Sequence, residues 1–412
     1  MLNTHEPRIV HVDLNSCFAT VAQQAYRTLR GKPVVVAAYE TPGAIILAPS
    51  IEAKRFGIKT GMSVQDAQLL CPRIIVRQPD VGMVRDVHIK FQSICQDYSP
   101  DVRPKSIDEF VIDFTSMKHV GLRELVRISR DIKKRLRQDV GEWMRCNVGI
   151  ATNRFLAKVA AGLHKPDGLD VITHVNLLNV LGAITLLDLP GINVRYHARL
   201  NTHGIFTPLD FYHASMMTLK RGVFQSIVGY HWYLRLRGWE VDAVDFQRKT
   251  YGQQYALGKK TNDRRELSRI LLKLCEKMGR RLRRKGYVSH GIHIGCVETN
   301  GTYWHKGRKS HQPLYTTQDL FNEAQYVLNE RPPEPVVSQI SVHCYDIEKP
   351  IGSQSTLFDM ENKQARVSKA LDKINDRYGE FTITPALMMN MEKLVLDRIA
   401  FGRGGLPGEV QG

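Results

Sequence analysis

The sequence lacks the segments that would place a protein in a membrane or in an oxidising compartment. No window approaches the roughly 18 apolar residues that a transmembrane helix needs, and the first residues contain no apolar run typical of a secretory signal. The seven cysteines are scattered and lack the CxxC spacing of zinc sites. We therefore expect a cytoplasmic protein with reduced, mostly buried cysteines and no membrane association.

Acidic residues are also scarce, because 58 Lys and Arg stand against 41 Asp and Glu, for a formal net charge of +17. This excess predicts a polyanionic partner, nucleic acid first and an acidic membrane surface second. The absence of apolar spans weakens the second interpretation. There is no internal repeat and no low-complexity run, and 412 residues predict roughly two to four domains.

The residue pattern predicts a mixed α/β first part, a mainly helical middle at 171–240 and a small α/β domain after it. From about 346 onward the sequence is tail-like, with one predicted helix near 364–378. The first part is predicted to hold strands at 8–15, 34–38, 44–47, 106–115 and 148–151, with helices at 17–29, from Ser50 and at 153–163. The later domain is predicted to hold strands at 251–257, 291–299 and 336–345, with helices at 266–285 and 318–329.

Three acids occupy positions where acids are poor strand formers. Asp13 lies within an apolar strand, and Asp108 and Glu109 begin another. Burying a carboxylate is costly unless a cation or hydrogen-bond donors compensate it. Hard cations such as Mg²⁺ bind one or two carboxylates together with substrate phosphates. Taken singly, each acid is more often a solvated or ion-paired group, and spacing alone does not bring Asp13 to Asp108.

The chain resembles Y-family DNA polymerases of the bacterial DinB/UmuC type. The resemblance covers about residues 1–345, and it is specific because many short segments occur in the family's order. These segments are HVDLNSCFATV at 11–21, LRGKPVVV at 29–36, EAKRFGIKTG at 52–61, SIDE at 106–109, VGIA at 148–151, AK at 157–158 and KPDG at 165–168.

The resemblance implies a right-hand, multi-domain α/β polymerase fold. Its parts are a catalytic palm at 1–28 and 72–168, fingers at 29–71, a helix-hairpin-helix-like thumb at 169–241, a little finger at 245–345 and a tail at 346–412. It further implies that Asp13 and Asp108 hold two Mg²⁺ ions and that Glu109 holds the ion at the primer 3′-hydroxyl. The backbone carbonyl of Leu14 would complete the nucleotide-side ion.

Other residues are assigned to the nucleotide by the same resemblance. Phe18 stands where the family keeps an aromatic steric gate against the ribose 2′-hydroxyl, although from the residues alone a core aromatic on the first helix is the better interpretation. Lys54, Lys59, Lys158 and Lys165 are the candidates for contact with the triphosphate. Many relatives have Tyr-Glu-Ala-Arg where this chain has IEAK at 51–54, and this departure implies weaker or differently arranged triphosphate binding. It is the one point in favour of a silent protein.

Two segments are candidates for holding the phosphates of primer-template DNA. Gly191, in a turn that resembles a helix-hairpin-helix, would offer backbone N–H groups, with Asn193 in place of the usual second glycine. Residues 245–285 carry fourteen Lys or Arg against four Asp or Glu, beyond what helix capping needs. Within them the predicted DNA ligands are Lys259, Lys260, Arg264, Arg265, Arg280 and Arg284.

The tail contains QSTLF at 354–358, similar to the peptide by which bacterial polymerases bind the sliding clamp. Leu357 and Phe358 would fill an apolar pocket while Gln354 hydrogen-bonds at its rim.

The leading hypothesis is thus a low-fidelity, lesion-bypassing DNA polymerase of the SOS response, which uses deoxynucleoside triphosphates and to which accessory subunits are a further suggested partner. The main alternative is a catalytically silent, polymerase-like protein that binds DNA and the clamp. A two-metal nuclease would use the same acids but needs neither Phe18 nor the lysines.

Overall fold

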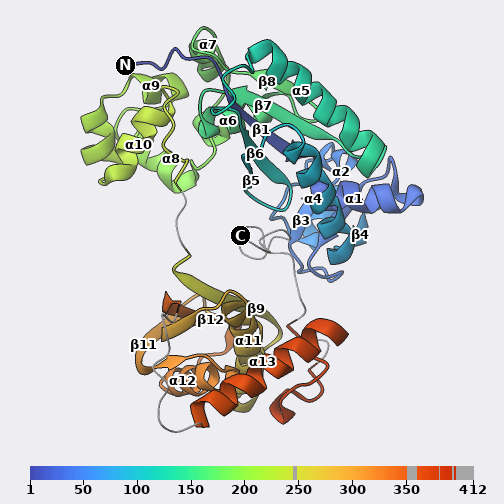
Figure 1. The fold of residues 1–412 in the computed structure, drawn as a ribbon, viewed down its shortest axis with the longest axis vertical. Helices are drawn as coiled ribbons and strands as arrows, with labels where there is room; N and C mark the ends of the chain where they lie inside the picture. Colours follow the sequence, from blue (N-terminus) through green and yellow to red (C-terminus); the bar gives the residue numbers. More distant parts are fainter. Residues whose placement is uncertain (245–247, 350–359, 380, 392–393, 396–412) are drawn as a thin grey trace. The chain divides into compact units, whose positions relative to one another are not determined.

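The computed structural model describes residues 1–244, 248–349, 360–379, 381–391 and 394–395 (Figure 1). These residues divide into a first compact unit, Met1–Val244, and a second within Asp245–Asp397. All seven cysteines are buried and free, as predicted. In the described ranges, no helix is long and apolar enough to cross a bilayer.

A five-stranded sheet with the order β5-β6-β1-β7-β8 forms the centre of the first unit. Its middle strand β1 (Ile9–Leu14) pairs antiparallel with β6 (Glu109–Asp113) on one side and with β7 (Cys146–Ala151) on the other. The edges are β5 (Val102–Pro104) and β8 (Leu169–Val171). The predicted strands at 8–15, 106–115 and 148–151 are thereby confirmed, since their β-branched side chains fill both faces of a covered sheet.

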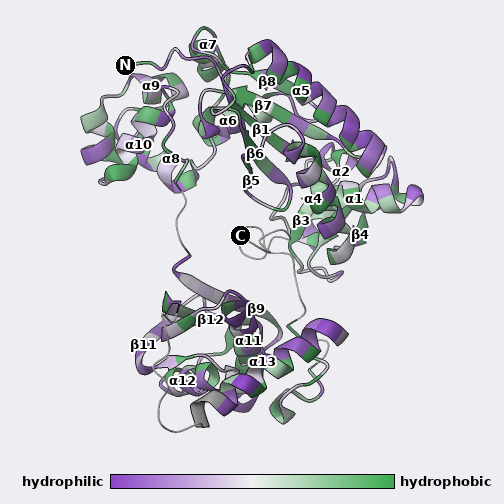
Figure 2. Cartoon of the chain, in the orientation of Figure 1, coloured by the Kyte–Doolittle hydropathy of each residue, from purple (hydrophilic) through white to green (hydrophobic). Residues whose placement is uncertain are grey.

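Helices cover both faces of this sheet. The helices α1 (Cys17–Ala25), α4 (Val81–Gln96) and α5 (Leu122–Arg135) share one hydrophobic core with it. On the other face lies α6 (Arg154–Leu163), whose first turn is capped by the Asn153 side chain. Figure 2 shows the apolar strands enclosed by helices with hydrophilic outer faces.

The predicted helical segment is also confirmed. It contains α7 (Leu177–Ala183), α8 (Val194–Asn201), α9 (Pro208–His213) and α10 (Ile227–Arg235), and it shares its core with α6. The predicted thumb at 169–241 begins, however, with β8, which pairs with the central sheet.

A second, small sheet with the order β3-β2-β4 corresponds to the predicted fingers. It consists of β2 (Val34–Ala37), β3 (Ile46–Pro49) and β4 (Ile75–Arg77), with α2 (Ile51–Lys54) and α3 (Val64–Leu70) between them. Ser50 caps α2 by accepting a hydrogen bond from the backbone of Ala53 at 3.2 Å, as its sequence position indicates. Because β4 pairs in parallel with β2, this sheet extends beyond the predicted boundary at residue 71.

The second unit is built on an antiparallel sheet with the order β11-β10-β12-β9. Its strands are β9 (Thr250–Thr261), β10 (Val288–Glu298), β11 (Tyr303–Leu314) and β12 (Val337–Glu348). Two helices, α11 (Arg264–Arg284) and α12 (Thr317–Asn329), pack on one face. The strand β11 was not predicted, because it lies at the sheet edge and its mostly exposed, polar side chains show no alternation.

The segment predicted as a tail after residue 346 also differs from expectation. Its described part belongs to the second unit, where α13 (Met360–Tyr378) and a short 3₁₀ helix (Ala386–Met388) follow the sheet. Met388, Met391 and Val395 are buried in the core of this unit. The second unit therefore includes described residues between 360 and 395 and does not end at residue 345 as predicted.

Candidate active site

The three predicted carboxylates meet at one end of the central sheet. Asp13 on β1 lies directly opposite Glu109, the first residue of β6, in the antiparallel register. The backbone N–H of Leu14 donates to the carbonyl of Asp108 at 2.9 Å, which holds the segment before β6 against the end of β1. Two strands that are distant in sequence therefore bring Asp13, Asp108 and Glu109 together.

The electrostatics of Asp108 reflect this crowding. The pKa of its carboxyl is raised to about 6, mainly by burial and then by the charges of Asp13 and Glu109, against a lowering by the hydrogen bond from Ser106. The Ser106 hydroxyl donates to Asp108 Oδ1 at 2.5 Å. A bound cation would favour the ionised form, since an opposite charge within a few ångströms lowers a carboxyl pKa.

Two lysines neutralise the other two acids. Lys158 Nζ, on α6, donates to both Glu109 oxygens at 2.9 and 2.7 Å, and Lys165 Nζ pairs with Asp13 Oδ2. The pKa of Lys54 is lowered by partial burial and by Lys165, while Asp13 raises it, so this lysine belongs to the same group although much of it is exposed. These three candidates for triphosphate contact therefore line the carboxylates.

Lys59, the fourth candidate, is different. Its side chain is exposed and has no hydrogen bond or ion pair to the carboxylates within the described residues. Its role stays a prediction.

The side chains fit hard divalent cations by donor type, since carboxylate oxygens are the ligands that Mg²⁺ prefers. The backbone brings the three residues together, but in the part of the chain that the structure describes no three His, Cys, Asp or Glu side chains are arranged as a metal cluster. The reason is visible in the ion pairs, because Asp13 and Glu109 are turned to Lys165 and Lys158.

Phe18 is buried, with 3% of its surface exposed, in the core beneath the central sheet. It also borders a cavity of about 280 Å³ whose other walls include Tyr26, Glu40 and Arg77. The core interpretation is therefore confirmed, and the steric-gate role stays a prediction.

His11 is a residue that the sequence analysis did not single out. Its ring is buried, with Nε2 3.8 Å from Glu109 Oε2. Burial, aided by the charge of Lys158, lowers its pKa to about 3, so the imidazole beside Glu109 is neutral near pH 7. The spacing of two between His11 and Asp13 on one strand was the available signal, because such residues share a face.

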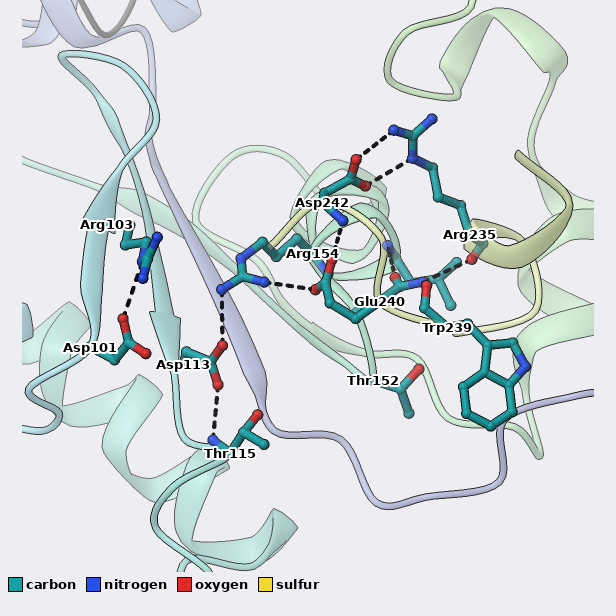
Figure 3. Close-up of polar contacts among 12 residues, drawn as sticks. Asp101, Arg103, Asp113, Thr115, Thr152, Arg154, Arg235, Trp239, Glu240 and Asp242 are labelled. Atoms are coloured by element: carbon teal, nitrogen blue, oxygen red, sulfur yellow. Dashed lines mark hydrogen bonds and ion pairs between the residues drawn. The ribbon is translucent and has the colours of Figure 1, made fainter. Parts of the chain in front are cut away.

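A polar network fixes the start of α6, the helix that carries Lys158 (Figure 3). The buried guanidinium of Arg154 contacts Asp113 Oδ2 at 2.9 Å and Glu240 Oε2 at 3.1 Å. The Asn153 amide donates to the carbonyls of Arg235 and Trp239, both at 2.9 Å. The chain leaving the helical segment is thereby attached to the sheet that carries the carboxylates.

The turn at Gly191 has the backbone that the predicted phosphate-binding motif needs. Gly191 has a φ of +98°, a left-handed conformation that favours glycine. Asn193 is not left-handed: its φ of −96° is ordinary, and its side chain caps α8 by accepting from Arg195 and Tyr196. Where the usual motif has a second glycine, this chain therefore has a helix-capping residue in an extended conformation.

The predicted DNA ligands of the second unit fall into two groups. Lys259 and Lys260 on β9 are exposed, as are Arg264 and Arg265 at the start of α11, so all four are accessible to a ligand.

Arg280 and Arg284 instead donate to Asp376 of α13, each at 2.7 Å, and Arg280 is only 6% exposed. Arg280 does not face solvent, because α13 covers this side of α11. The clamp-binding residues Gln354, Leu357 and Phe358 lie outside the described residues.

Comparisons with known proteins agree with the geometry. Residues 12–162 match the model of the impB/mucB/samB family, and residues 248–357 match the model of the family's C-terminal domain. A DNA polymerase IV of Pelotomaculum thermopropionicum is 30% identical over 396 residues, covering 95% of this chain and 97% of the relative. One of Moorella thermoacetica is 32% identical over 392 residues, covering 92% and 96%.

Solved structures show the same fold. A chimeric Y-family DNA polymerase containing Dbh sequence is similar with a TM-score of 0.73 at 22% identity, over 83% of this chain and 99% of that one. DinB from Sulfolobus solfataricus is similar with a TM-score of 0.54 at 21% identity, over 82% and 98%. The predicted multi-domain α/β polymerase fold is confirmed.

Proposed function

The chain belongs to the impB/mucB/samB family, the Y-family DNA polymerases of the DinB type, and from this membership we propose that it is a DNA-directed DNA polymerase that copies damaged templates with low fidelity. The observation that carries the proposal is the meeting of Asp13, Asp108 and Glu109 at adjacent strand ends beside three lysines. A silent relative has no need of this arrangement.

The proposed reaction joins a deoxynucleotide to a primer. The primer 3′-hydroxyl attacks the α-phosphorus, the bond to the bridging oxygen breaks, and pyrophosphate leaves. Two bound Mg²⁺ ions would supply activation of the hydroxyl and neutralisation of the phosphates. Asp13 and Asp108 would hold both ions, with Glu109 at the primer side and the carbonyl of Leu14 at the nucleotide side.

Lys158 and Lys165 would have two roles, one in the free protein and one when the nucleotide is bound. Lys158 and Lys165 neutralise Glu109 and Asp13 in the free protein, at 2.7 Å in the first pair. When a nucleotide binds, its phosphates are negatively charged, as the carboxylates are, and can replace Asp13 and Glu109 as partners of the two lysines. The lysines would then bind the triphosphate and leave the carboxylates to the metal ions, with Lys54 beside them.

Low fidelity follows from the small size of the fingers. The sheet β3-β2-β4 has three short strands and two short helices, a limited surface with which to test the shape of the new base pair. Phe18 would still select the sugar, since a ring under the 2′ position collides with a ribose hydroxyl. Primer-template DNA, the sliding clamp through QSTLF, and SOS accessory subunits are the proposed partners.

Primer extension by the purified full-length chain tests the proposal. A 5′-labelled primer is annealed to an undamaged template and to a matched template with one abasic site, with Mg²⁺ and four deoxynucleotides. We expect extension on the first and insertion opposite the abasic site on the second. A protein that leaves both primers unchanged is a silent relative, and one that shortens them is a nuclease.

A further inference from the structure

The second unit contains a layer that lies beyond the family match, which ends at residue 357. Residues 360–395 in this layer cover cations of α11 that would otherwise be exposed. Lys273 Nζ donates to the carbonyls of Met391 and Leu394, both at 2.6 Å, and Lys277 Nζ donates to the carbonyl of Val395 at 3.1 Å. Only 2% of Lys273 and 6% of Lys277 is exposed. The layer is thus an integral part of the folded unit.

The helix α13 faces α11 with its acidic side. Asp372 accepts two hydrogen bonds from the buried guanidinium of Arg283, at 2.7 and 2.8 Å. One turn later Asp376 accepts from Arg280 and Arg284. Asp372 and Asp376 are the only acidic residues between 363 and 379, so the docking contacts use every carboxylate of this stretch.

The exposed side of α13 carries five cations. Its cations recur every three or four residues, which places them along one face of the helix, and all are exposed. Among the described residues, none of them has a carboxylate partner, and Arg377 lies over the ring of Tyr378. The hydrophilic bands along α13 are visible in Figure 2. This basic row consists of Lys363, Arg366, Lys369, Lys373 and Arg377.

We propose that the basic row of α13 binds the phosphate backbone of duplex DNA without recognising its sequence, as a second DNA contact of the polymerase. The row is about 21 Å long at 1.5 Å per helical residue. Duplex DNA carries about one phosphate charge per 1.7 Å of axis, so a row of this length faces several phosphates. The docking of α13 by Asp372 and Asp376 holds the row rigidly in place.

An acidic protein is the less suitable partner for this face. Protein interfaces obtain most of their binding energy from a few residues, above all Trp, Tyr and Arg, that are buried in well-packed pockets at the centre of the interface. Val367, 51% exposed, is the one large exposed aliphatic side chain among the described side chains of α13, and Tyr378 is engaged by Arg377. A row of cations with little apolar surface is typical of phosphate binding.

The salt dependence of DNA binding tests the proposal. The triple variant Arg366→Gln, Lys369→Gln, Lys373→Gln removes three cations while retaining helix propensity. The matched control is Arg123→Gln, Arg130→Gln, Lys134→Gln, which removes three exposed cations from α5 in the first unit. Fluorescence anisotropy with a blunt 30-base-pair duplex, at several salt concentrations, gives the slope of log Kd against log salt for each full-length protein.

We expect the α13 variant to lose about 2 to 3 from this slope, at roughly 0.9 per phosphate contact, and the α5 variant to retain the parent slope. An unchanged slope in a folded α13 variant, or an equal loss in both variants, would overturn the proposal. The inference rests on the proposed function only for the identity of the partner. Primer extension at low salt distinguishes failure of this inference from failure of the proposed function. If the parent protein extends the primer but the α13 variant has an unchanged slope, only the DNA-binding role of the basic row is rejected. If the α13 variant has a reduced slope but the parent protein does not extend the primer, only the polymerase function is rejected.

Discussion

Asp13 lies opposite Glu109 across two antiparallel strands, and each of the two carboxylates is paired with a lysine from the region of α6. Three acids at one sheet end repel each other, and the pKa of Asp108 is raised mainly by burial and to a smaller extent by the charges of Asp13 and Glu109. The two lysines reduce this repulsion. Their side chains are 42% exposed for Lys158 and 46% exposed for Lys165, so they can move away when a metal ion binds. The free protein thus holds Asp13 and Glu109 beside cations at the same sheet end as Asp108.

The first prediction concerns these lysines. Lys165→Ala and Lys158→Ala should each raise KM for the deoxynucleotide about 10- to 100-fold, because a hydrogen bond to a charged group contributes about 1.5–3 kcal/mol. Single-nucleotide insertion kinetics measure this change. Lys118→Ala, which removes an exposed lysine away from the carboxylates, serves as the control. Nucleotide dependence that stays at the parent value in both site variants would contradict the role in phosphate binding.

The second prediction separates the two roles of Phe18. Phe18→Leu should increase ribonucleotide insertion at least tenfold relative to the deoxynucleotide, since the smaller side chain leaves room for the 2′-hydroxyl. Phe114→Leu is the matched control, because Phe114 is fully buried in the same core. Both changes should lower stability by about 1–3 kcal/mol, and only the first should alter sugar selection. Equal sugar selection in the two variants would reject the steric-gate role of Phe18, and only its role in the core would remain.

The third prediction concerns the docking of α13. Asp372→Asn leaves the guanidinium of Arg283, 3% exposed, without its carboxylate and should destabilise the second unit by about 3–5 kcal/mol. Asp346→Asn breaks an ion pair with Lys309 whose partners are 53% and 73% exposed, and should cost at most about 1 kcal/mol. Urea unfolding measures both. Equal small losses would mean that α13 does not contribute to the stability of the unit.

The fourth prediction is a pH dependence. His88 is fully buried, with its ring on Phe110 and Nδ1 2.8 Å from the carbonyl of Ile107. Burial lowers its pKa, against a smaller raising by that hydrogen bond, so the folded protein holds it neutral. Because the pKa of His88 is lower in the folded protein, the unfolded chain binds the proton at a higher pH than the folded protein does as the pH falls. Its contribution to stability is therefore present above the unfolded pKa, about 6.5, and is lost as the pH falls below it.

The variant His88→Asn tests this, since the amide can still donate to the Ile107 carbonyl but does not titrate. We expect the parent to lose up to about 2 kcal/mol more than the variant between pH 7 and pH 5, at 1.36 kcal/mol per pH unit for one proton. Urea unfolding at both pH values gives the difference. His174→Asn, at an exposed histidine, should behave as the parent does. A variant as acid-sensitive as the parent would assign the effect to other groups.

Much of the first unit could be predicted from its residues. The apolar alternation around Asp13 identified β1, and Ser50 and Asn153 marked the starts of α2 and α6 through their capping side chains. The meeting of Asp13 with Asp108 could not be derived from spacing, because strand pairing over ninety-five residues has no local signal. It came from the resemblance, and the register of β1 with β6 confirmed it.

The second unit was harder to predict from the sequence, because part of its core is formed by charged side chains that an apolar pattern does not reveal. The stripe of Leu267, Ile270, Leu271, Leu274 and Met278 indicates one buried face of α11, and Arg280 and Arg284 on the rest of the helix were assigned to DNA. The helix is buried on both sides, and Arg280 and Arg283 are satisfied by Asp372 and Asp376, about ninety residues later. A sequence pattern cannot show such a partner, and Arg280, predicted to contact DNA, is instead buried and donates to Asp376.

The central claim is that Asp13, Asp108 and Glu109 act together with metal ions in nucleotide transfer. The most direct measurement is single-turnover primer extension in Mg²⁺ by Asp108→Asn and Glu109→Gln, beside Asp101→Asn, which alters an exposed carboxylate paired with Arg103 on the same sheet. We predict a loss of at least about a thousandfold for the first two, comparable to removing a principal electrostatic group, and a parent-like rate for the third. Extension at the parent rate by folded Asp108→Asn or Glu109→Gln protein would contradict the account.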